Sequence, residues 1–266
     1  MRIVRYQETE SGERSGAPGT GDVSYGILGT DGLITPLVGG PYGDRRPGAG
    51  PVLAADAVTL LAPVEPTKVI AVGRNFAAHA AELGNQVPER PLIFLKPSTS
   101  VIGPGADIVF PGYTEELHHE AELAAVIGVR CRDLEPEEVP AALLGYTCAN
   151  DVTARDLQKP DGQWWRAKGS DTFCPLGPWV ETELDTAALR ITATVNGELR
   201  QEGGTHQMVR PVNELIAHIS AAMTLLPGDV ILTGTPAGVS RMHPGDVVTV
   251  AVEGLGELTN PVVEAV

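Results

Sequence analysis

The chain has 266 residues, of which 42% are hydrophobic and 20% charged, a composition typical of a globular protein with a buried core rather than a disordered one. The formal net charge of −15 repels phosphate backbones and anionic membranes, so we exclude nucleic acid as a partner and expect an anionic ligand to need local positive charge or a bound cation. No apolar run suits a signal peptide or a membrane span, which predicts a cytoplasmic protein without a membrane partner.

The first part of the chain predicts a small, few-stranded antiparallel β domain. Two apolar runs flank Thr30-Asp31-Gly32, and Asp-Gly between such runs is typical of a β-hairpin. Residues 39–51 concentrate glycine and proline and indicate a loop or linker between this leading segment and the main body. We therefore divide the chain into a small N-terminal β domain with its linker, residues 1–66, and a main domain, residues 67–266.

From Thr67 onward, short β-like runs recur between Gly, Pro or Asn residues and predict a strand-rich body. The runs are KVIAV, PLIFL, DIVF, ELAAVIGV, RITATVNG, DVILTG and DVVTVAVEG. Only three segments predict helices, Phe76–Leu83, Glu135–Leu144 and Val212–Leu225. So few helices among closely spaced strands argue against a doubly wound α/β sheet and favour a mixed, β-rich α+β fold, as a β-roll or sandwich.

The segment HHEAELAAVIG, residues 118–128, places two acidic residues two positions apart. On a strand, residues two apart share a face, so Glu120 and Glu122 would project side by side while Leu123 and Ile127 occupy the other face. Adjacent carboxylates repel each other, and in a partly buried site a cation or a proton relieves that repulsion. From spacing alone, a solvated strand edge with two glutamates in water remains the more frequent alternative.

A third acidic residue, Asp151, directly follows the apolar stretch LLGYTCA, at the end of a segment that we expect to be buried. A charge there is costly unless it is paired or bound to a metal, although Asn150-Asp151 is also common turn and helix-capping chemistry. Three carboxylates would be hard ligands suited to Mg²⁺ or Mn²⁺. Zinc is disfavoured, because no cluster of histidines and cysteines has zinc spacing.

The segment GRNFAAHAAEL, residues 73–83, contains the candidate acid–base pair. On a helix, His79 and Glu82 are three residues apart and lie on one face, where the carboxylate orients the imidazole and raises its basicity. The pair could act as a general base for water, on a short helix that could form a lid. The alternative is a surface His–Glu pair that contributes roughly a few tenths of a kcal/mol.

Several cationic or donor groups flank these candidates. Arg74, Lys96 and Lys168 each lie next to apolar sequence and could serve an anion, although most lysines are solvated surface charges. Gly234-Thr235-Pro236 follows the run DVIL, and a turn there could offer backbone N–H groups to a carboxylate. An ordinary strand-ending turn explains the same three residues at least as well.

Six blocks of the sequence, taken in order, resemble one known family. They are GRNFAAHAAE, FLKPSTSVIGPG, HHEAELAAVIG, GYTCANDVTARDLQ, WWRAKGSDTFCPLGPW and LLPGDVILTGTPAG, and they lie between about Lys68 and Gly238. Together they resemble the fumarylacetoacetate hydrolase family, and GELTNPVVE near the end also fits. A coincidence of six spaced blocks is far rarer than a chance match to any one of them.

The resemblance implies a mixed β-roll catalytic domain, a small N-terminal domain, Mg²⁺ or Mn²⁺ as the cofactor, and a homodimer. It also implies roles for particular residues. The metal ligands would be Glu120, Glu122 and Asp151, the catalytic residues His79, Glu82 and Lys168, and the substrate-binding residues Arg74, Lys96, Gln163 and Thr235. One departure is Phe76, where many relatives carry tyrosine, so a hydroxyl that orders the lid or binds substrate in relatives would be lost here.

Within the family, the sequence is most similar to the smaller members that act on acylpyruvates and oxaloacetate. We therefore expect metal-dependent cleavage of a carbon–carbon bond in a small anionic 2-oxo acid, by acylpyruvate hydrolysis or oxaloacetate decarboxylation through a metal-stabilised pyruvate enolate. One alternative is an isomerase or decarboxylase of intermediates such as 2-hydroxyhepta-2,4-diene-1,7-dioate, against which the lack of an internal repeat weighs. Another is a non-catalytic metal- or ligand-binding β-protein, against which the intact His79–Glu82 pair weighs.

Overall fold

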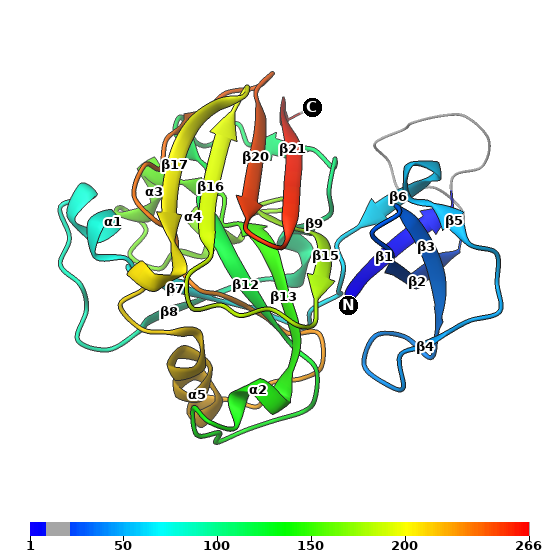
Figure 1. Cartoon of the computed structure of the whole chain (residues 1–266). Helices are drawn as coiled ribbons and strands as arrows, with labels where there is room; N and C mark the ends of the chain where they lie inside the picture. Colours follow the sequence, from blue (N-terminus) through cyan, green and yellow to red (C-terminus); the bar gives the residue numbers. More distant parts are fainter. Residues whose placement is uncertain (9–21, 266) are drawn as a thin grey trace.

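The computed structural model describes residues 1–8 and 22–265, and within these ranges the chain forms three β-sheets and five α-helices. The architecture is the mixed, β-rich α+β fold that the sequence predicts (Figure 1). Strands of the largest sheet follow the order β4-β3-β2-β1-β15-β13-β12-β18-β7-β8. Strands β12, β13 and β18 have a neighbour on each edge, and an apolar cluster covers each of their two faces, which explains their continuous apolar sequences.

The bounds of the elements are as follows. The large sheet contains β1 (Arg2–Glu8), β2 (Val23–Leu28), β3 (Leu33–Val38), β4 (Arg46–Pro47), β5 (Leu53–Ala54), β6 (Val58–Leu61), β7 (Val69–Gly73), β8 (Leu92–Lys96), β9 (Val101–Ile102), β12 (Ala121–Ile127), β13 (Leu143–Asn150), β15 (Cys174–Glu181) and β18 (Val230–Leu232). A second sheet contains β10 (Ile108–Phe110), β16 (Arg190–Val195), β17 (Glu198–Gly204), β20 (Val247–Val252) and β21 (Gly256–Glu264), and a third contains β11 (Leu117–His118), β14 (Thr153–Ala154) and β19 (Arg241–Met242). The α-helices are α1 (Ala77–Glu82), α2 (Val139–Ala142), α3 (Arg155–Gln158), α4 (Trp165–Gly169) and α5 (Val212–Ala222).

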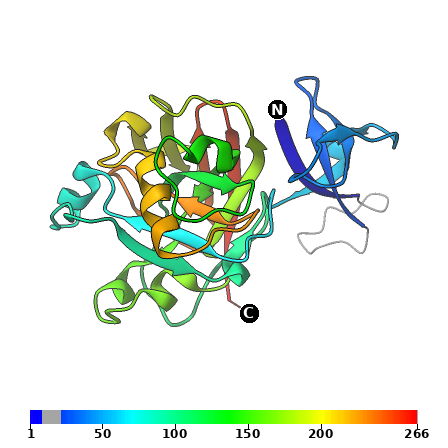
Figure 2. The same ribbon diagram turned by 90° about the horizontal axis from the view of Figure 1, so that it is seen from below.

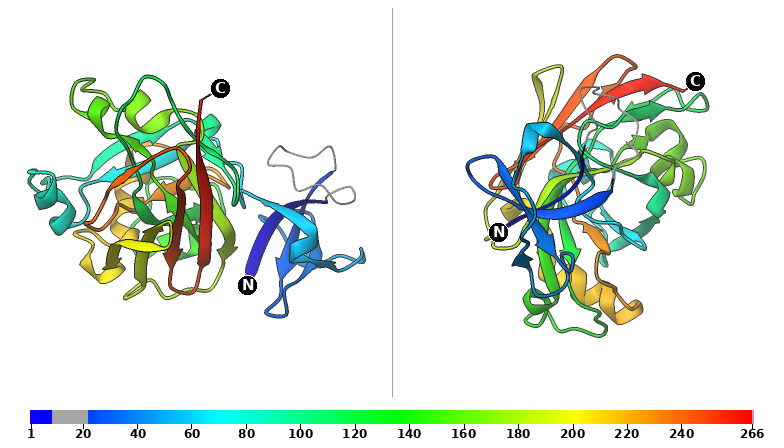
Figure 3. Two further views of the ribbon diagram at one scale, coloured as in Figure 1. Left: turned by 90° about the horizontal axis from the view of Figure 1, so that it is seen from above. Right: turned by 90° about the vertical axis from the view of Figure 1, so that its right-hand side faces the viewer.

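The N-terminal strands β1 to β6 lie to one side of the rest of the chain in Figure 1, in Figure 2 and in the left view of Figure 3. Strands β2 and β3 form the antiparallel hairpin that the sequence predicts. The interpretation of residues 39–51 as a linker to the main body is wrong, because β5 and β6 follow this loop and pair back with β3 and β1. The chain enters the main body after β6, and the domain boundary at residue 66 stays a prediction.

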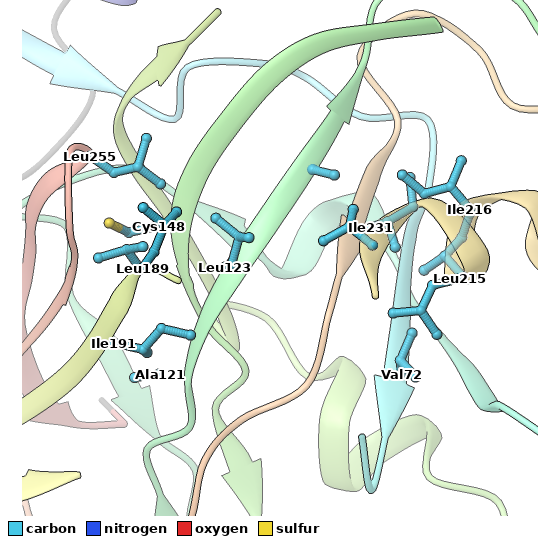
Figure 4. Packing of buried hydrophobic residues seen from close by; sticks show 14 of the residues in the cluster. Val72, Ala121, Leu123, Cys148, Leu189, Ile191, Leu215, Ile216, Ile231 and Leu255 are labelled. Carbon is cyan, nitrogen blue, oxygen red and sulfur yellow. The ribbon is translucent and has the colours of Figure 1, made fainter. Parts of the chain in front are cut away.

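Strand β12 carries the acidic pair and crosses the centre of the main body. Its odd-numbered residues, 121–127, pack in the core cluster that includes α5 and the inner faces of β16 and β20. Figure 4 shows Leu123 in this cluster together with Ile191 of β16 and Ile216 of α5. Ala124 and Val126 belong to a second apolar cluster, and strand alternation places Glu122 on that same second face. The core thus fixes the register of the strand that carries the acids.

Most predicted elements are confirmed, and one helix is largely wrong. Each of the seven predicted β-runs overlaps a strand, and α1 and α5 lie within the predicted ranges. The predicted helix Glu135–Leu144 shrinks to the four residues of α2, because its last two residues begin β13. There the apolar run pairs with β12 on one side and β15 on the other, and this tertiary pairing outweighs local helix propensity. Helices α3 and α4 are too short for a periodic pattern, and the sequence did not predict them.

Candidate active site

The pairing of β12 with β13 brings three acidic residues together. The strands are antiparallel with Ala121 opposite Asn150, so Glu120 and Asp151, just outside that pair, also face each other. The Asp151 amide donates to the Glu120 carbonyl at 2.9 Å. Ligand oxygens of Glu120, Glu122 and Asp151 lie within 4.8 Å of one another, and the three residues are 4%, 1% and 1% exposed. Buried carboxylates this close together could hold a divalent cation.

Three cationic side chains contact this acidic cluster. Lys168 of α4 donates to Glu120 Oε2 at 2.7 Å and to Asp151 Oδ2 at 2.6 Å. Lys96, the last residue of β8, donates to Asp151 Oδ1 and to the Lys168 carbonyl. Arg155, the first residue of α3, donates to the other carboxylate oxygen of Glu120. Two of the three acids are therefore compensated by direct ion pairs, which offset the cost of burying a carboxylate.

Glu122 is the one acid of the cluster with no ion pair among the described residues. Its Oε2 accepts a hydrogen bond from the Gly234 amide at 2.7 Å. Burial, together with the charges of Asp151 and Glu120, raises the pKa of Glu122 well above its ordinary value of 4.5. The carboxyl group therefore favours a proton when no cation is bound, and a cation would replace that proton.

The ion pairs hold their members charged. Burial alone would raise the pKa of Glu120, but Lys168 and Arg155 together hold it below its ordinary value. Burial would likewise lower the pKa of the Lys168 ammonium, but Asp151 and Glu120 raise it above its ordinary value. The ammonium also lies 5.2 Å from the centre of the Phe94 ring, a favourable contact for a cation. Lys168 is thus a fixed positive charge inside the site.

The predicted acid–base pair lies on α1, whose alanine-rich sequence favours a helix. His79 is 5% exposed, and its Nδ1 lies 3.3 Å from Glu82 Oε2. The other carboxylate oxygen of Glu82 accepts from the Gly238 amide at 2.9 Å. Gly84, with φ of +67°, ends the helix by donating to the Ala81 carbonyl. The carboxylate is therefore held on both sides, which orients the imidazole.

A cavity of about 790 Å³ joins the acidic cluster to His79. The predicted site residues on its wall are His79, Glu120, Glu122, Asp151, Lys168, Arg74, Gln163 and Thr235. Glu82 and Lys96 do not line the cavity, but each contacts a residue that does, Glu82 contacting His79 and Lys96 contacting Asp151. The structure therefore brings the ten predicted residues into one region, with two of them acting on the cavity only through a neighbour.

Some wall residues were missed from the sequence. Arg155 and Gln158 of α3 both line the cavity, and the Arg155 guanidinium donates to Gln158 Oε1 at 2.7 Å. The signal that could have found them is their position in the block that also contains Asp151. Phe76, where many relatives were expected to carry tyrosine, is 2% exposed and packs in the core rather than on the wall.

Residues 68–263 match the family model for the C-terminal domain of fumarylacetoacetate hydrolase. The chain belongs to the fumarylacetoacetate hydrolase family. Within it, the rat mitochondrial oxaloacetate tautomerase Fahd2a is 44% identical over 226 residues, which cover 80% of this chain and 72% of the rat protein. The match confirms the family that the six sequence blocks indicated.

Two solved structures of family members extend the comparison. The crystal structure of 5-carboxymethyl-2-hydroxymuconate delta-isomerase from Mycobacterium smegmatis has 45% identity and a TM-score of 0.89 over all of both chains. That of fumarylpyruvate hydrolase from Pseudomonas aeruginosa, in complex with Mn²⁺ and pyruvate, has 33% identity and a TM-score of 0.72, covering 78% of this chain and 92% of that one. Both likenesses confirm the predicted fold.

These relatives of the chain within the fumarylacetoacetate hydrolase family are named as a tautomerase, an isomerase and a hydrolase, so the family consists of enzymes with more than one reaction. The family assignment therefore supports an enzyme without selecting its reaction. In the part of the chain that the structure describes, no helix is long and apolar enough to cross a membrane.

Proposed function

We propose that this family member is a divalent-metal-dependent enzyme that breaks a carbon–carbon bond in a small 2-oxo acid, by acylpyruvate hydrolysis or oxaloacetate decarboxylation. The observation that supports it most is the meeting, in one cavity, of a buried carboxylate cluster with the imidazole of a His–Glu pair. The cluster alone would support metal binding only. The imidazole adds a group that can move a proton, which a non-catalytic binding protein does not need.

Glu120, Glu122 and Asp151 would hold the metal. Mg²⁺ and Mn²⁺ suit them best, because both are hard cations that take carboxylate oxygens as ligands. The fit rests on Glu122, a buried acid that has a raised pKa and forms no ion pair with any residue that the structure describes. When bound, the cation supplies Lewis-acid stabilisation for the negative charge that develops on the substrate. The Mn²⁺ of the Pseudomonas relative supports the same class of cation.

The cavity wall offers the positive charge that an anionic substrate needs in a chain with a net charge of −15. Arg74 and Lys159 line the cavity and have no ion pair among the described residues, so both remain available to a substrate carboxylate. We assign Arg74, Gln163 and Thr235 to substrate binding. Their positions on the wall suit this role. Arg74 and Gln163 carry side-chain donors, whereas the Thr235 hydroxyl already donates to the Ala121 carbonyl at 2.8 Å, so Thr235 would offer its backbone N–H instead.

Lys96 is a special case among the proposed substrate-binding residues. Its ammonium is buried behind Asp151, to which it donates, and it does not line the cavity. A direct contact between Lys96 and substrate therefore stays a prediction. Its hydrogen bonds to Asp151 and to the Lys168 carbonyl support a different role, in which Lys96 orients Asp151.

For an acylpyruvate, His79 accepts a proton from water while Glu82 holds the imidazole in place. The oxygen of that water bonds to the distal carbonyl carbon, and the bond between this carbon and the pyruvate methylene breaks. The electron pair stays on the pyruvate fragment as an enolate, which takes the proton back from His79, and the acyl fragment leaves as a carboxylic acid. Lys168 contributes fixed positive charge beside the developing negative charge.

Oxaloacetate reaches the same enolate without water. The bond to the distal carboxylate breaks, CO₂ leaves, and the remaining enolate takes one proton from bulk solvent to give pyruvate. His79 has no water to activate in this reaction, so it should matter more for hydrolysis than for decarboxylation.

The purified chain with Mg²⁺ or Mn²⁺ should be tested against acetylpyruvate, fumarylpyruvate, oxaloacetate and 2-hydroxyhepta-2,4-diene-1,7-dioate, by loss of ultraviolet absorbance and release of pyruvate. We expect turnover that a chelator abolishes. His79→Ala should abolish hydrolysis and spare decarboxylation, while His218→Ala, at an exposed histidine of α5, should change neither. Equal loss of both reactions contradicts the division of labour, and no turnover of any substrate contradicts the proposed function.

A second candidate is a tautomerase or isomerase of a 2-oxo acid. The names of the rat and M. smegmatis relatives favour it, because both are more similar to this chain than the named hydrolase is. In this case His79 would move a proton between carbon and oxygen, and no carbon–carbon bond would break. Conversion of the enol form of oxaloacetate to the keto form, without pyruvate release from any substrate, would favour the isomerase.

We also propose that the chain forms a homodimer, on the basis of the family resemblance. Sedimentation as one species at twice the 27.9 kDa of the chain would support this. A stable monomer that retains full activity would contradict it.

A further inference from the structure

Gln201 of β17 is fully buried and uses both ends of its side-chain amide. Its Oε1 accepts from His119 Nδ1 at 2.8 Å and from the Ala121 amide at 3.0 Å. Its Nε2 donates to Thr235 Oγ1 and to the Pro236 carbonyl, both at 2.8 Å. Because a main-chain N–H can only donate and a carbonyl can only accept, two of these partners fix which end of the amide is oxygen.

The orientation of Gln201 determines the tautomer of His119. Since Gln201 Oε1 accepts, His119 Nδ1 carries the proton, and His119 Nε2 accepts from the Ser240 hydroxyl at 2.8 Å. The His119 amide also donates to the Ser240 carbonyl at 3.3 Å. The segment Thr235–Ser240 is therefore tied at both ends to the chain on either side of Glu120.

Close packing holds the same segment against β17. A Cβ on Gly238 would lie 2.4 Å from the Arg200 carbonyl oxygen, and a Cβ on Gly203 would lie 2.5 Å from Pro236 Cβ. Gly238 also has φ of +101°, a conformation that favours glycine. The position of the Gly238 amide is thus set by β17 and not by the loop alone.

That amide is the donor that holds Glu82 beside His79. We propose that Gln201 is a positioning residue for the acid–base pair, which it couples to the strand that carries the metal ligands. The inference rests on the proposed function, since that function gives His79 its role as a base. Gln201 itself is not on the cavity wall, so it would act only through the segment Thr235–Ser240 and Glu82.

Gln201→Met removes all four hydrogen bonds at nearly constant side-chain length. In the Mn²⁺-loaded full chain we expect unchanged Mn²⁺ affinity, little change in KM, and a fall in kcat for acetylpyruvate of about ten- to a hundredfold, as small misplacements of catalytic groups produce. Oxaloacetate decarboxylation, which needs no water, should fall less. Gln207→Met is the matched control, because Gln207 is exposed and, among the described residues, its side chain accepts only from the nearby Gly204 amide.

A readout without turnover separates this inference from the proposed function. In the Mg²⁺-loaded protein, the ¹⁵Nδ1 resonance of His79 should move in Gln201→Met and stay in place in Gln207→Met, whether or not any substrate is consumed. Ser240→Ala, which removes one tie of the same segment, should move it less and keeps the test available if Gln201→Met does not fold. The proposal is overturned if the resonance stays in place in both Gln201→Met and Ser240→Ala. It is also overturned if hydrolysis, decarboxylation and Mn²⁺ affinity fall equally.

Discussion

Buried carboxylates lie at both ends of the parallel strands β7 and β18, and the protein surrounds them in opposite ways. At the starting end, Asp229 is fully buried and accepts from the Thr67 hydroxyl at 2.6 Å and from the Leu226 and Lys68 amides at 2.8 and 3.3 Å. The Lys68 ammonium completes its contacts. This closed site leaves the Asp229 carboxylate with a donor for each oxygen and a matching charge.

At the far end of the same strands, Glu122 meets the Gly234 amide that follows β18. It has two neighbouring carboxylates and no ion pair among the described residues, and its pKa is raised. The difference teaches that burial of an acid is not itself a sign of function. The candidate active site is marked by an acid whose burial and neighbouring carboxylates disfavour its ionised form. A bound cation would supply the positive charge that this acid lacks.

The largest expected effect comes from Glu122→Gln. The amide is a weaker, neutral ligand. Loss of a residue that hydrogen-bonds to a metal ligand typically costs roughly 10- to 100-fold, so loss of a ligand itself should lower Mn²⁺ affinity and turnover by more than that. In chelator, the amide replaces a carboxyl group that Asp151 and Glu120 keep from ionising, and it retains an oxygen for the Gly234 amide, so the thermal unfolding midpoint should not fall. Titration calorimetry with Mn²⁺ and thermal unfolding with EDTA test both halves, with the exposed Glu214→Gln as control. If Glu122→Gln binds Mn²⁺ as tightly as the wild type does, Glu122 is not a metal ligand, and the proposed difference between Glu122 and Asp229 is wrong.

Asp229→Ala should show the reverse pattern. It leaves two backbone amides and a hydroxyl without their acceptor, so the free energy of unfolding should fall by about 3 to 5 kcal/mol. Turnover per folded molecule should be unchanged, because the site lies at the opposite end of β18 from Glu122. Urea unfolding and active-site-normalised kinetics measure the two quantities. A loss of turnover with full stability would show that the two ends are not independent.

The sequence predicted the acids but not what distinguishes them. Alternation on a strand was enough to place Glu120 and Glu122 together, whereas the approach of Asp151 depends on the antiparallel register of β12 and β13, which no local pattern contains. Asp229 follows Pro227-Gly228 and reads as an ordinary turn residue. The residues that surround Asp229 and Glu122 include ones distant in the sequence, such as Thr67 for Asp229 and Gly234 for Glu122.

The same limit applies to the supporting residues and to the fold. Gln201 lies in the polar run ELRQEGG, which gives no sign of a fully buried amide, because its partners come from β12 and from the segment after β18. Lys96 matched a family block, yet only the structure places it behind Asp151. Short strands with clear boundaries were predictable, whereas β13 was partly mistaken for a helix because its pairing partners decide its conformation.

The pH dependence of metal binding should show a moderate effect that comes from Glu122. Between the ordinary pKa of 4.5 and its raised value, Glu122 keeps a proton in the folded, metal-free protein that the unfolded chain has lost. Stability without metal should therefore fall as pH rises through this window. Metal binding releases the proton, so Mn²⁺ affinity should rise with pH by up to about tenfold per unit. Titrations across pH should show a weaker slope in Glu122→Gln, and an identical slope would rule out Glu122 as the source.

The smallest effect is expected for Lys68→Met, which tests whether charge or neutral donors stabilise the closed end. The Lys68 side chain is 24% exposed, so water already screens its ammonium, and Asp229 keeps its hydroxyl and amide donors in the variant. Urea unfolding should show a loss of about 1 to 2 kcal/mol, between the values for an exposed and a buried pair and smaller than that for Asp229→Ala. Added to Asp229→Ala, the change should cost nothing further, because the partner of the ammonium is already absent. A loss as large as that of Asp229→Ala would mean that charge balance governs both ends, and that they differ only in whether the compensating cation is a lysine or a metal.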